Sequence, residues 1–137
     1  MGDIFRSESV AMTEEYGRKL AESLTAGTVV ALYGGMGMGK TALVRGIAAG
    51  LELEAEVSSP TFALVHDYGG QPPLVHFDMY RVSGWDDLYS TGFFDYLDAG
   101  AILVVEWSEN IENALPADAI RLRLQQVDDC TRLIERG

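Results

Sequence analysis

The chain is poor in cysteine and in positive charge, and both shortages restrict what it can be. Cys130 is the only cysteine among 137 residues, so no disulfide can form within the chain. The lysines and arginines number 10 against 21 aspartates and glutamates, which gives a net charge of −11. Because such a surface repels phosphate backbones, we expect no extensive direct contact with nucleic acid. A chain without disulfides fits a reducing compartment.

The chain also lacks a long apolar segment. Its longest uncharged stretch, residues 23–39, is shorter than the roughly 20 residues that span a bilayer, and it contains several glycines. The first ten residues do not join a basic start to an apolar core, as a secretory signal would. We therefore expect a cytoplasmic protein with no membrane partner. The length and the hydrophobic fraction of 47% predict a single globular domain over residues 1–137.

Patterns typical of strands and of helices alternate along the chain. Apolar residues recur every three or four positions over residues 10–25 and again after residue 40, which predicts two helices, the second capped by Gly50. Strands are predicted over residues 3–8, 28–33, 61–68, 73–80, 101–107, 119–126 and 131–136, and short helical segments between 83 and 100. Interleaved strands and helices indicate an α/β fold with helices on both faces of a sheet.

The segment "GGMGMGKT", residues 34–41, lies between a predicted strand and a predicted helix and matches the pattern G-x-x-x-x-G-K-[ST]. In such a loop, glycines let backbone N–H groups approach a polyphosphate, which also faces the N-terminus of the following helix. The lysine adds a positive charge, and the threonine offers a hydroxyl to Mg²⁺. The alternative is a glycine-rich turn with a solvated lysine. The predicted nucleotide-binding residues here are Gly35, Met36, Gly37, Met38, Gly39, Lys40, Thr41 and Ala42.

Two acidic residues stand at the ends of apolar strands. Asp78 ends "LVHFD" and Glu106 ends "ILVVE". A carboxylate at the C-terminal end of a buried strand is what a triphosphate site uses to support Mg²⁺ or to orient a water molecule. We therefore predict Lys40, Asp78 and Glu106 as catalytic residues, with Thr41 and Glu106 at the metal. The sequence does not decide which acid supports the metal and which orients the water.

Further residues allow two interpretations each. Thr61, in "SSPTF", could belong to a switch that senses the γ-phosphate, although the residues alone favour a plain turn at Pro60. Trp107, next to Glu106, could contact a ligand or only pack. His66 and His76 lie in apolar strands without cysteine or histidine at ligand spacing, so we expect them in the core or at its rim. Arg45 and Arg81 could contact phosphates or pair with acids.

Taken together, these segments resemble the TsaE family, small bacterial ATPases that serve threonylcarbamoyladenosine synthesis on tRNA. The segments that carry the resemblance are "GGMGMGKTALVRGIAAGL", "VSSPTFALVHDY", "HFDMYR" and "VVEWSENI", within residues 9 to 125. The resemblance implies a P-loop NTPase-like three-layer α/β domain with a mixed, mainly parallel central sheet. It also implies that ATP and Mg²⁺ bind, that ATP is hydrolysed slowly, and that the partners are the threonylcarbamoyl transferase (TsaD) and its inactive paralogue (TsaB).

The resemblance also bears on single residues. It places Thr61 in the switch-like segment and Trp107 at the nucleotide site or at the partner surface. Three positions depart from the usual pattern: Gly35 stands where an acid is common, Met38 where a small residue is common, and Ala42 where a second threonine is common. These departures leave Lys40 and Thr41 in place, so they affect fine tuning and not nucleotide binding.

Two other functions remain open at this point. A small-molecule kinase of the same fold class would need a lid that carries arginines, and this chain has no obvious insertion for one. A non-catalytic, nucleotide-dependent interaction module would bind ATP and signal by conformation alone. A GTPase is disfavoured, because Asn110 and Asn113 are the only asparagines and neither begins an N-K-x-D guanine-reading motif.

Overall fold

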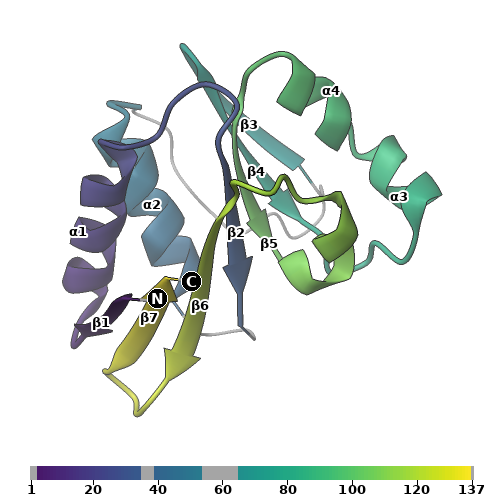
Figure 1. Cartoon of the computed structure of the whole chain (residues 1–137). Coiled ribbons are helices and arrows are strands. Elements are labelled where there is room, and N and C mark those ends of the chain that lie inside the picture. Colours follow the sequence, from purple (N-terminus) through teal and green to yellow (C-terminus); the bar gives the residue numbers. More distant parts are fainter. Residues whose placement is uncertain (1–2, 35–38, 54–64, 137) are drawn as a thin grey trace.

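The computed structural model describes residues 3–34, 39–53 and 65–136 (Figure 1). Its elements follow in the order β1 (Asp3–Ser7), α1 (Val10–Ala21), β2 (Val29–Tyr33), α2 (Lys40–Gly50), β3 (Val65–Gly70), β4 (Pro73–Asp78), α3 (Trp85–Ser90), α4 (Phe93–Asp98), β5 (Ile102–Glu106), the 3₁₀ helix η1 (Ser108–Ala114), β6 (Ile120–Gln126) and β7 (Arg132–Arg136). The predicted alternation of strands and helices is confirmed.

The strands of the described residues form one seven-stranded sheet in the order β1-β7-β6-β2-β5-β4-β3. Strand β2 is parallel to both β6 and β5, and β5 is parallel to β4. Strand β7 pairs antiparallel with β1 and β6, and β3 pairs antiparallel with β4. Among the described strands, only β7 and β3 therefore run against the others, so the sheet is mixed and mainly parallel, as predicted.

Helices cover both faces of this sheet, which explains why its central strands are continuously apolar. Every residue of β2 and of β5 is buried. Successive side chains of a strand point to opposite faces, so Ile102 and Val104 join the core under α1 and α2, while Leu103 and Val105 join the core under α3 and α4. Figure 1 shows the two pairs of helices on opposite sides of the strands. The predicted three-layer arrangement is confirmed.

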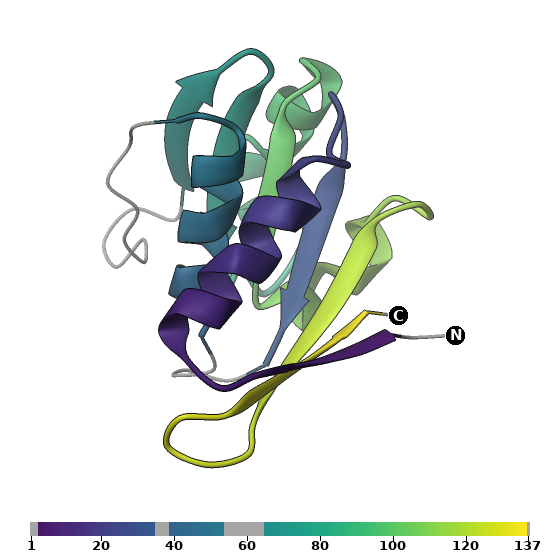
Figure 2. The ribbon, with the colours of Figure 1, turned by 90° about the vertical axis from the view of Figure 1, so that its left-hand side faces the viewer.

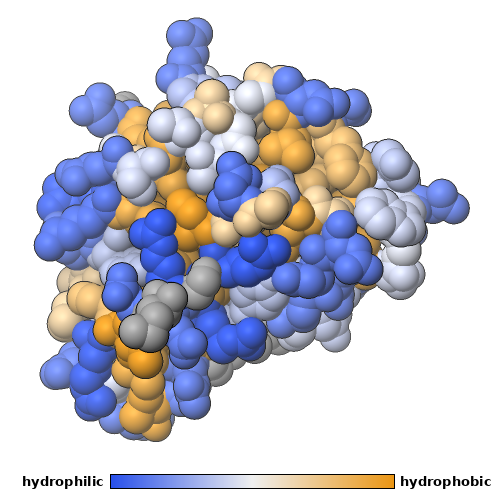
Figure 3. All heavy atoms as spheres, viewed as in Figure 1, coloured by the Kyte–Doolittle hydropathy of each residue, from blue (hydrophilic) through white to orange (hydrophobic). Residues whose placement is uncertain are grey.

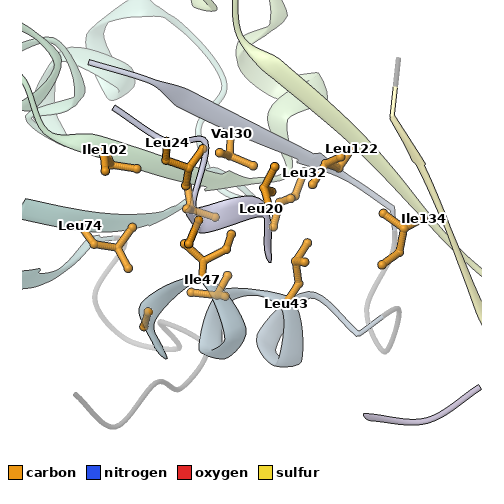
Figure 4. Packing of buried hydrophobic residues seen from close by; sticks show 14 of the residues in the cluster. Leu20, Leu24, Val30, Leu32, Leu43, Ile47, Leu74, Ile102, Leu122 and Ile134 are labelled. Carbon is orange, nitrogen blue, oxygen red and sulfur yellow. The ribbon is translucent and has the colours of Figure 1, made fainter. Parts of the chain in front are cut away.

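The first of these cores holds α2 in place. Leu43 and Ile47 of α2 are fully buried and belong to the same cluster as Leu20, Leu32 and Leu122 (Figure 4). Each such side chain contributes roughly 1.5–3 kcal/mol by leaving water. The packing of its apolar face therefore fixes α2, and with it the N-terminus of this helix, against the sheet.

Close contact with α1 fixes α2 further (Figure 2). A Cβ atom built on Gly46 would lie 2.0 Å from the carbonyl oxygen of Glu14, and one on Gly17 would lie 2.4 Å from that of Leu43. The two helices therefore pack backbone against backbone. The predicted cap at Gly50 is wrong: Gly50 lies inside α2, where a Cβ would lie 2.6 Å from the Cβ of Ala21, and Leu51 is the C-cap.

Several predicted boundaries differ from the observed ones; the strand expected over residues 73–80, for example, ends at Asp78. The first helix was expected to reach residue 25 but ends at Ala21, because the N–H groups of Ser23 and Leu24 bond the carbonyls of Leu20 and Ala21 in tighter turns. Strand β3 begins at Val65, and residues 61–64 of the predicted strand lie outside the described residues.

The outer surface carries both polar and apolar residues (Figure 3). Figure 3 shows hydrophilic residues interspersed with smaller apolar areas on one side of the molecule. None of the described helices has both the length and the apolar composition needed to cross a bilayer.

Candidate active site

The glycine-rich segment joins a strand to a helix, as predicted. β2 ends at Tyr33 and points toward the lower edge of the sheet in Figure 1, and α2 begins at Lys40. Gly34 and Gly39 flank the loop with φ values of 131° and 87°, where a side chain would be strained. Gly35, Met36, Gly37 and Met38 lie outside the described residues, as does Thr61, so the roles predicted for them stay predictions.

The N-terminus of α2 presents backbone donors at this loop. Its N-cap is Gly39, which has no side chain to bond the first-turn N–H groups. The first N–H groups of any α-helix have no partner within the helix, and they carry the positive end of its dipole. Lys40, Thr41 and Ala42 occupy this first turn, with Thr41 half-buried and the other two buried. The turn is therefore suited to an anion.

Lys40 folds back over the start of the loop. Its Nζ donates to the carbonyl oxygen of Gly34 at 2.9 Å and lies 3.6 Å from Oε1 of Glu106. The same Nζ stands 4.9 Å from the centre of the Trp107 ring, a cation–π distance. The residue is only 5% exposed. The alternative of a solvated lysine is therefore wrong, because the ammonium is enclosed by a carbonyl, a carboxylate and an indole.

Glu106 is the acidic partner in this enclosure. It ends β5, is 5% exposed, and its Oε2 accepts a hydrogen bond from Nε2 of His76 at 2.6 Å. Burial by itself would raise the pKa of the Glu106 carboxyl. The His76 hydrogen bond and the charges of His76 and Lys40 outweigh burial, and they hold this pKa below its ordinary value. Glu106 therefore stands beside Lys40 as a carboxylate.

Asp78 lies next to Glu106 across the sheet. The two residues are register partners on the parallel strands β4 and β5, and both close their strands. Oδ1 of Asp78 accepts from the backbone N–H of Tyr80 at 2.9 Å. The structure thus brings together Lys40, Asp78 and Glu106, the three residues predicted as catalytic, on the helix α2 side of the sheet edge.

Trp107 forms one wall of the site. Its φ of 58° is unusual for a side chain of this size and turns the chain from β5 into η1. The indole packs against the ring of Tyr80, with centres 4.9 Å apart. Nδ2 of Asn110 donates to the carbonyl of Met79 at 2.8 Å and so ties η1 to the end of β4. Trp107 is thereby held against Lys40, as the prediction that it lies at the site requires.

A second contact ties η1 to the beginning of the loop. The hydroxyl of Tyr33, the last residue of β2, donates to Oε2 of Glu112 in η1, and Nε of Arg121 lies 3.3 Å from the other carboxylate oxygen. Burial and the neighbouring Glu112 carboxylate raise the pKa of Tyr33 to about 12. Tyr33 is therefore a neutral donor at physiological pH, and it braces the strand that delivers the loop.

The donors present fit a magnesium ion that is bound mainly through phosphate oxygens. Mg²⁺ in such sites takes one or two protein carboxylates and a hydroxyl, and the phosphates and waters complete its coordination. Glu106 and Asp78 supply carboxylates at one sheet edge, and Thr41 supplies a hydroxyl in the first turn of α2. No cluster of three or more histidine, cysteine or acidic residues that could hold an ion by itself occurs among the described residues.

The other candidates resolve as follows. His76 is fully buried, as expected of a core histidine, but its bond to Glu106 was not foreseen. His66 is half-buried and lies 3.2 Å from the hydroxyl of Tyr68. Arg45 pairs with an acid, Glu14, at 2.6 Å. Arg81 is exposed and lines a hollow of about 370 Å³ beside α3.

Two neighbours of the loop escaped the sequence analysis. A Cβ atom on Gly39 would lie 3.8 Å from Cγ of Arg132 and 3.8 Å from Cγ2 of Thr13. Arg132 begins β7 and Thr13 lies in α1, so segments far apart in the sequence meet at Gly39. Nothing in their local sequence signals this proximity, which results from the pairing of β1 with β7.

The fold and the arrangement of the site residues together indicate the structural class of the protein. A mixed sheet between two layers of helices, with a glycine-rich strand-to-helix loop and acids at the ends of adjacent parallel strands, is the architecture of P-loop NTPase domains. A family model described as threonylcarbamoyl adenosine biosynthesis protein TsaE matches residues 7–134. The chain therefore belongs to the TsaE family of tRNA threonylcarbamoyladenosine biosynthesis proteins.

Individual relatives agree with this assignment. The chain is 34% identical to the tRNA threonylcarbamoyladenosine biosynthesis protein TsaE of Treponema pallidum, over 93% of this chain and 95% of that protein. It is 44% identical to the protein of the same name from Streptomyces coelicolor, over 82% of this chain and 78% of that one. The crystal structure of Bacillus subtilis YdiB matches with a TM-score of 0.79 and 27% identity, covering 99% of this chain and 84% of the other.

Proposed function

We propose that this chain binds ATP with Mg²⁺ and hydrolyses it slowly, as the ATPase subunit that supports N6-threonylcarbamoyladenosine synthesis on tRNA. The observation that carries the proposal is the enclosed pair of Lys40 and Glu106, whose Nζ and Oε1 lie 3.6 Å apart at the N-terminus of α2. A cation and a carboxylate beside a helix N-terminus suit a triphosphate and its metal. Membership of the TsaE family supplies the pathway.

The residues divide the work as follows. The N–H groups of the loop and of the first turn of α2 hold the phosphates. Lys40 gives up its hydrogen bond to the Gly34 carbonyl and binds the outer phosphates instead. Thr41 and Glu106 would hold Mg²⁺, which neutralises phosphate charge when it is bound. Asp78 is the register partner of Glu106. These two acids would share two roles, which are to support the metal and to orient the attacking water. Thr61 is proposed to respond to the γ-phosphate.

We propose as partners the threonylcarbamoyl transferase and its inactive paralogue, in the cytoplasm. Hydrolysis would sustain turnover of that complex and would not itself make the modification. The net charge of −11 supports contact through protein partners rather than through an extensive tRNA footprint.

One assay separates the proposal from its alternatives. The chain is incubated with γ-labelled ATP, with and without the purified transferase pair, and the fate of the label is measured. We expect free phosphate, with faster release when the pair is present. Label on a small acceptor would indicate a kinase. Phosphate release no higher than background with the pair present would indicate a non-catalytic nucleotide-binding module.

A second assay tests the pathway. Modified adenosine on tRNA is quantified in a reconstituted reaction that contains the transferase pair and either this chain or its Lys40→Ala variant. We expect repeated turnover only with the wild-type chain and ATP. Equal yields with both chains would contradict the proposed role.

A further inference from the structure

We infer that His76 is a positioning residue, which holds the carboxylate of Glu106 so that one oxygen is fixed and the other faces the nucleotide. The inference rests on the proposed function, since it concerns how the acid of that site is oriented. Its basis is a chain of contacts that runs from the core to the loop. His76 touches Glu106, and Glu106 touches Lys40.

The two oxygens of Glu106 have different neighbours. Oε2 accepts from Nε2 of His76 at 2.6 Å, and Oε1 lies 3.6 Å from Nζ of Lys40. The side chain of His76 is 0% exposed and that of Glu106 is 6% exposed. Because water is excluded from both, loss of the imidazole donor would leave Oε2 buried without a partner, a state that folded proteins avoid.

The imidazole itself is held in one orientation. A carboxylate can only accept, so Nε2 carries the hydrogen in this bond, and Nδ1 has no partner within the described ranges 3–34, 39–53 and 65–136. The ring stacks on Tyr68, with centres 6.5 Å apart and planes 29° apart. Among the described residues, His76 therefore donates its hydrogen bond to Glu106 alone. This arrangement matches the histidine–carboxylate pairs that orient reactive groups elsewhere in proteins.

Strand register explains why such a donor is needed. Asp78 is the direct partner of Glu106 on the adjacent strand, and like charges in matched positions repel one another. Each acid of this pair has its own donor: the N–H of Tyr80 bonds Asp78, and His76 bonds Glu106. His76 precedes Asp78 by two residues and so shares its face of β4.

The consequence appears when nucleotide binds. Lys40 then turns to the phosphates, and Oε1 of Glu106 loses the cation that it faces here. His76 remains bonded to Oε2, which keeps the side chain in place while Oε1 is available to a metal or a water. In the nucleotide-bound state, in which Lys40 contacts the phosphates, Glu106 therefore depends on His76 for its orientation.

The test compares three variants. His76→Leu removes the donor while keeping an apolar side chain, and His76→Gln places an amide N–H within reach of the same oxygen. His66→Leu is the matched control, because His66 is the register partner of His76 on β3 and donates nothing to the acids. ADP and ATP affinities are measured by calorimetry, and kcat for phosphate release is measured with the transferase pair present.

We expect His76→Leu to keep the nucleotide Kd within about 3-fold while kcat falls about 10- to 100-fold, the usual effect of losing an orienting partner. His76→Gln should recover most of kcat, and His66→Leu should retain it. If His76→Leu does not fold, His76→Asn, whose amide is too short to reach Glu106, tests the same loss. A folded His76→Leu or His76→Asn with wild-type kcat, or a Gln variant as slow as either, would overturn the inference.

A measurement without nucleotide separates this inference from the proposed function. Proton NMR of the protein alone should show an exchange-protected imidazole N–H resonance far downfield, which moves upfield in Glu106→Gln. If wild type releases no phosphate but the resonance responds to Glu106, the proposed function fails while the positioning contact stands. If the resonance is absent, or ignores Glu106, the positioning role is overturned whatever the activity.

Discussion

Nζ of Lys40 at the start of α2 lies 3.6 Å from Oε1 of Glu106 at the end of β5, and each residue is only 5% exposed. A buried ion pair of this kind adds little net stability, because desolvation offsets the attraction between its charges. Its presence therefore calls for a functional reason. A lysine that can turn from a carboxylate to a phosphate, next to a helix N-terminus, provides one.

Glu106→Ala is expected to separate binding from turnover. Lys40, Thr41 and the backbone donors of α2 remain, so the Kd for ATP should change by only a few fold. Hydrolysis should fall by about 10²–10³-fold, since the acid that supports the metal or orients the water is lost. Phosphate release with the transferase pair, alongside calorimetry, measures both quantities.

Glu109→Ala serves as the control for this experiment. Glu109 carries the same charge on η1 and is exposed. The Glu109→Ala variant should keep both the Kd for ATP and the rate of hydrolysis near those of the wild type. Wild-type hydrolysis by Glu106→Ala would show that the role assigned to Glu106 is wrong.

Gly46→Ala is expected to destabilise the protein. The new Cβ would lie 2.0 Å from the carbonyl oxygen of Glu14, and a backbone atom cannot rotate away. Overpacking of this kind costs about 1–3 kcal/mol or more in the free energy of unfolding, because α1 and α2 must separate. Chemical denaturation measures the loss. Gly84→Ala is the control, since nothing lies within 4 Å of a Cβ there. Equal stability of the two variants would contradict the close helix packing.

The turn between β6 and β7 is expected to contribute stability that depends on pH. The backbone N–H groups of Cys130 and Thr131 donate to Oδ1 of Asp128 and lower the pKa of its carboxyl below 3.8. A lowered folded-state pKa stabilises the protein above the unfolded-state value, and this contribution fades as the pH falls through the folded-state pKa.

The comparison is between wild type and Asp128→Asn. Asp128→Asn should melt at a lower temperature than wild type at pH 7. The difference should shrink as the pH falls below the ordinary aspartate pKa and through the lowered folded-state pKa, where the folded protein loses the charge. Asp129→Asn removes the same charge from the next residue and controls for net charge. A difference that stays constant down to pH 2 would refute the role of the carboxylate.

Trp107 is expected to report nucleotide binding by fluorescence. Its ring lies 4.9 Å from Nζ of Lys40, so movement of that cation to a phosphate alters the surroundings of the indole. Trp85, the other tryptophan, is 53% exposed and is replaced by phenylalanine for the measurement. Emission of Trp85→Phe should change on addition of ATP and magnesium, with a midpoint that matches calorimetry. An unchanged spectrum at saturation would mean that Lys40 does not leave Trp107.

The fold was largely predictable because its strands and helices have strong local patterns. The uninterrupted apolar residues of β2 and β5 reflect burial on both faces. The register of β4 with β5 places Asp78 beside Glu106. The glycine loop is equally local, since Gly34 and Gly39 need backbone angles that other residues resist. Local patterns therefore predicted which residues meet at this edge of the sheet.

Contacts between distant segments could not be predicted in this way. His76 looks like an ordinary strand residue until register sets it beside Glu106. Arg132 and Thr13 reach Gly39 only because β1 pairs with β7. Gly50 looked like a helix cap, but a glycine is needed there because Ala21 of α1 packs closely against it. The local sequence around Gly50 does not reveal this contact. Each depends on tertiary packing that a single sequence does not display.

The central claim is that this chain holds ATP between the N-terminus of α2 and Lys40. Isothermal titration of the wild-type protein with ATP and magnesium tests it most directly, with Lys40→Ala as the matched variant. The account predicts one site per chain in the wild type and an affinity loss on the order of 100-fold in Lys40→Ala, which lacks the buried ammonium. No heat of binding in the wild type, or equal affinity in both proteins, would contradict it.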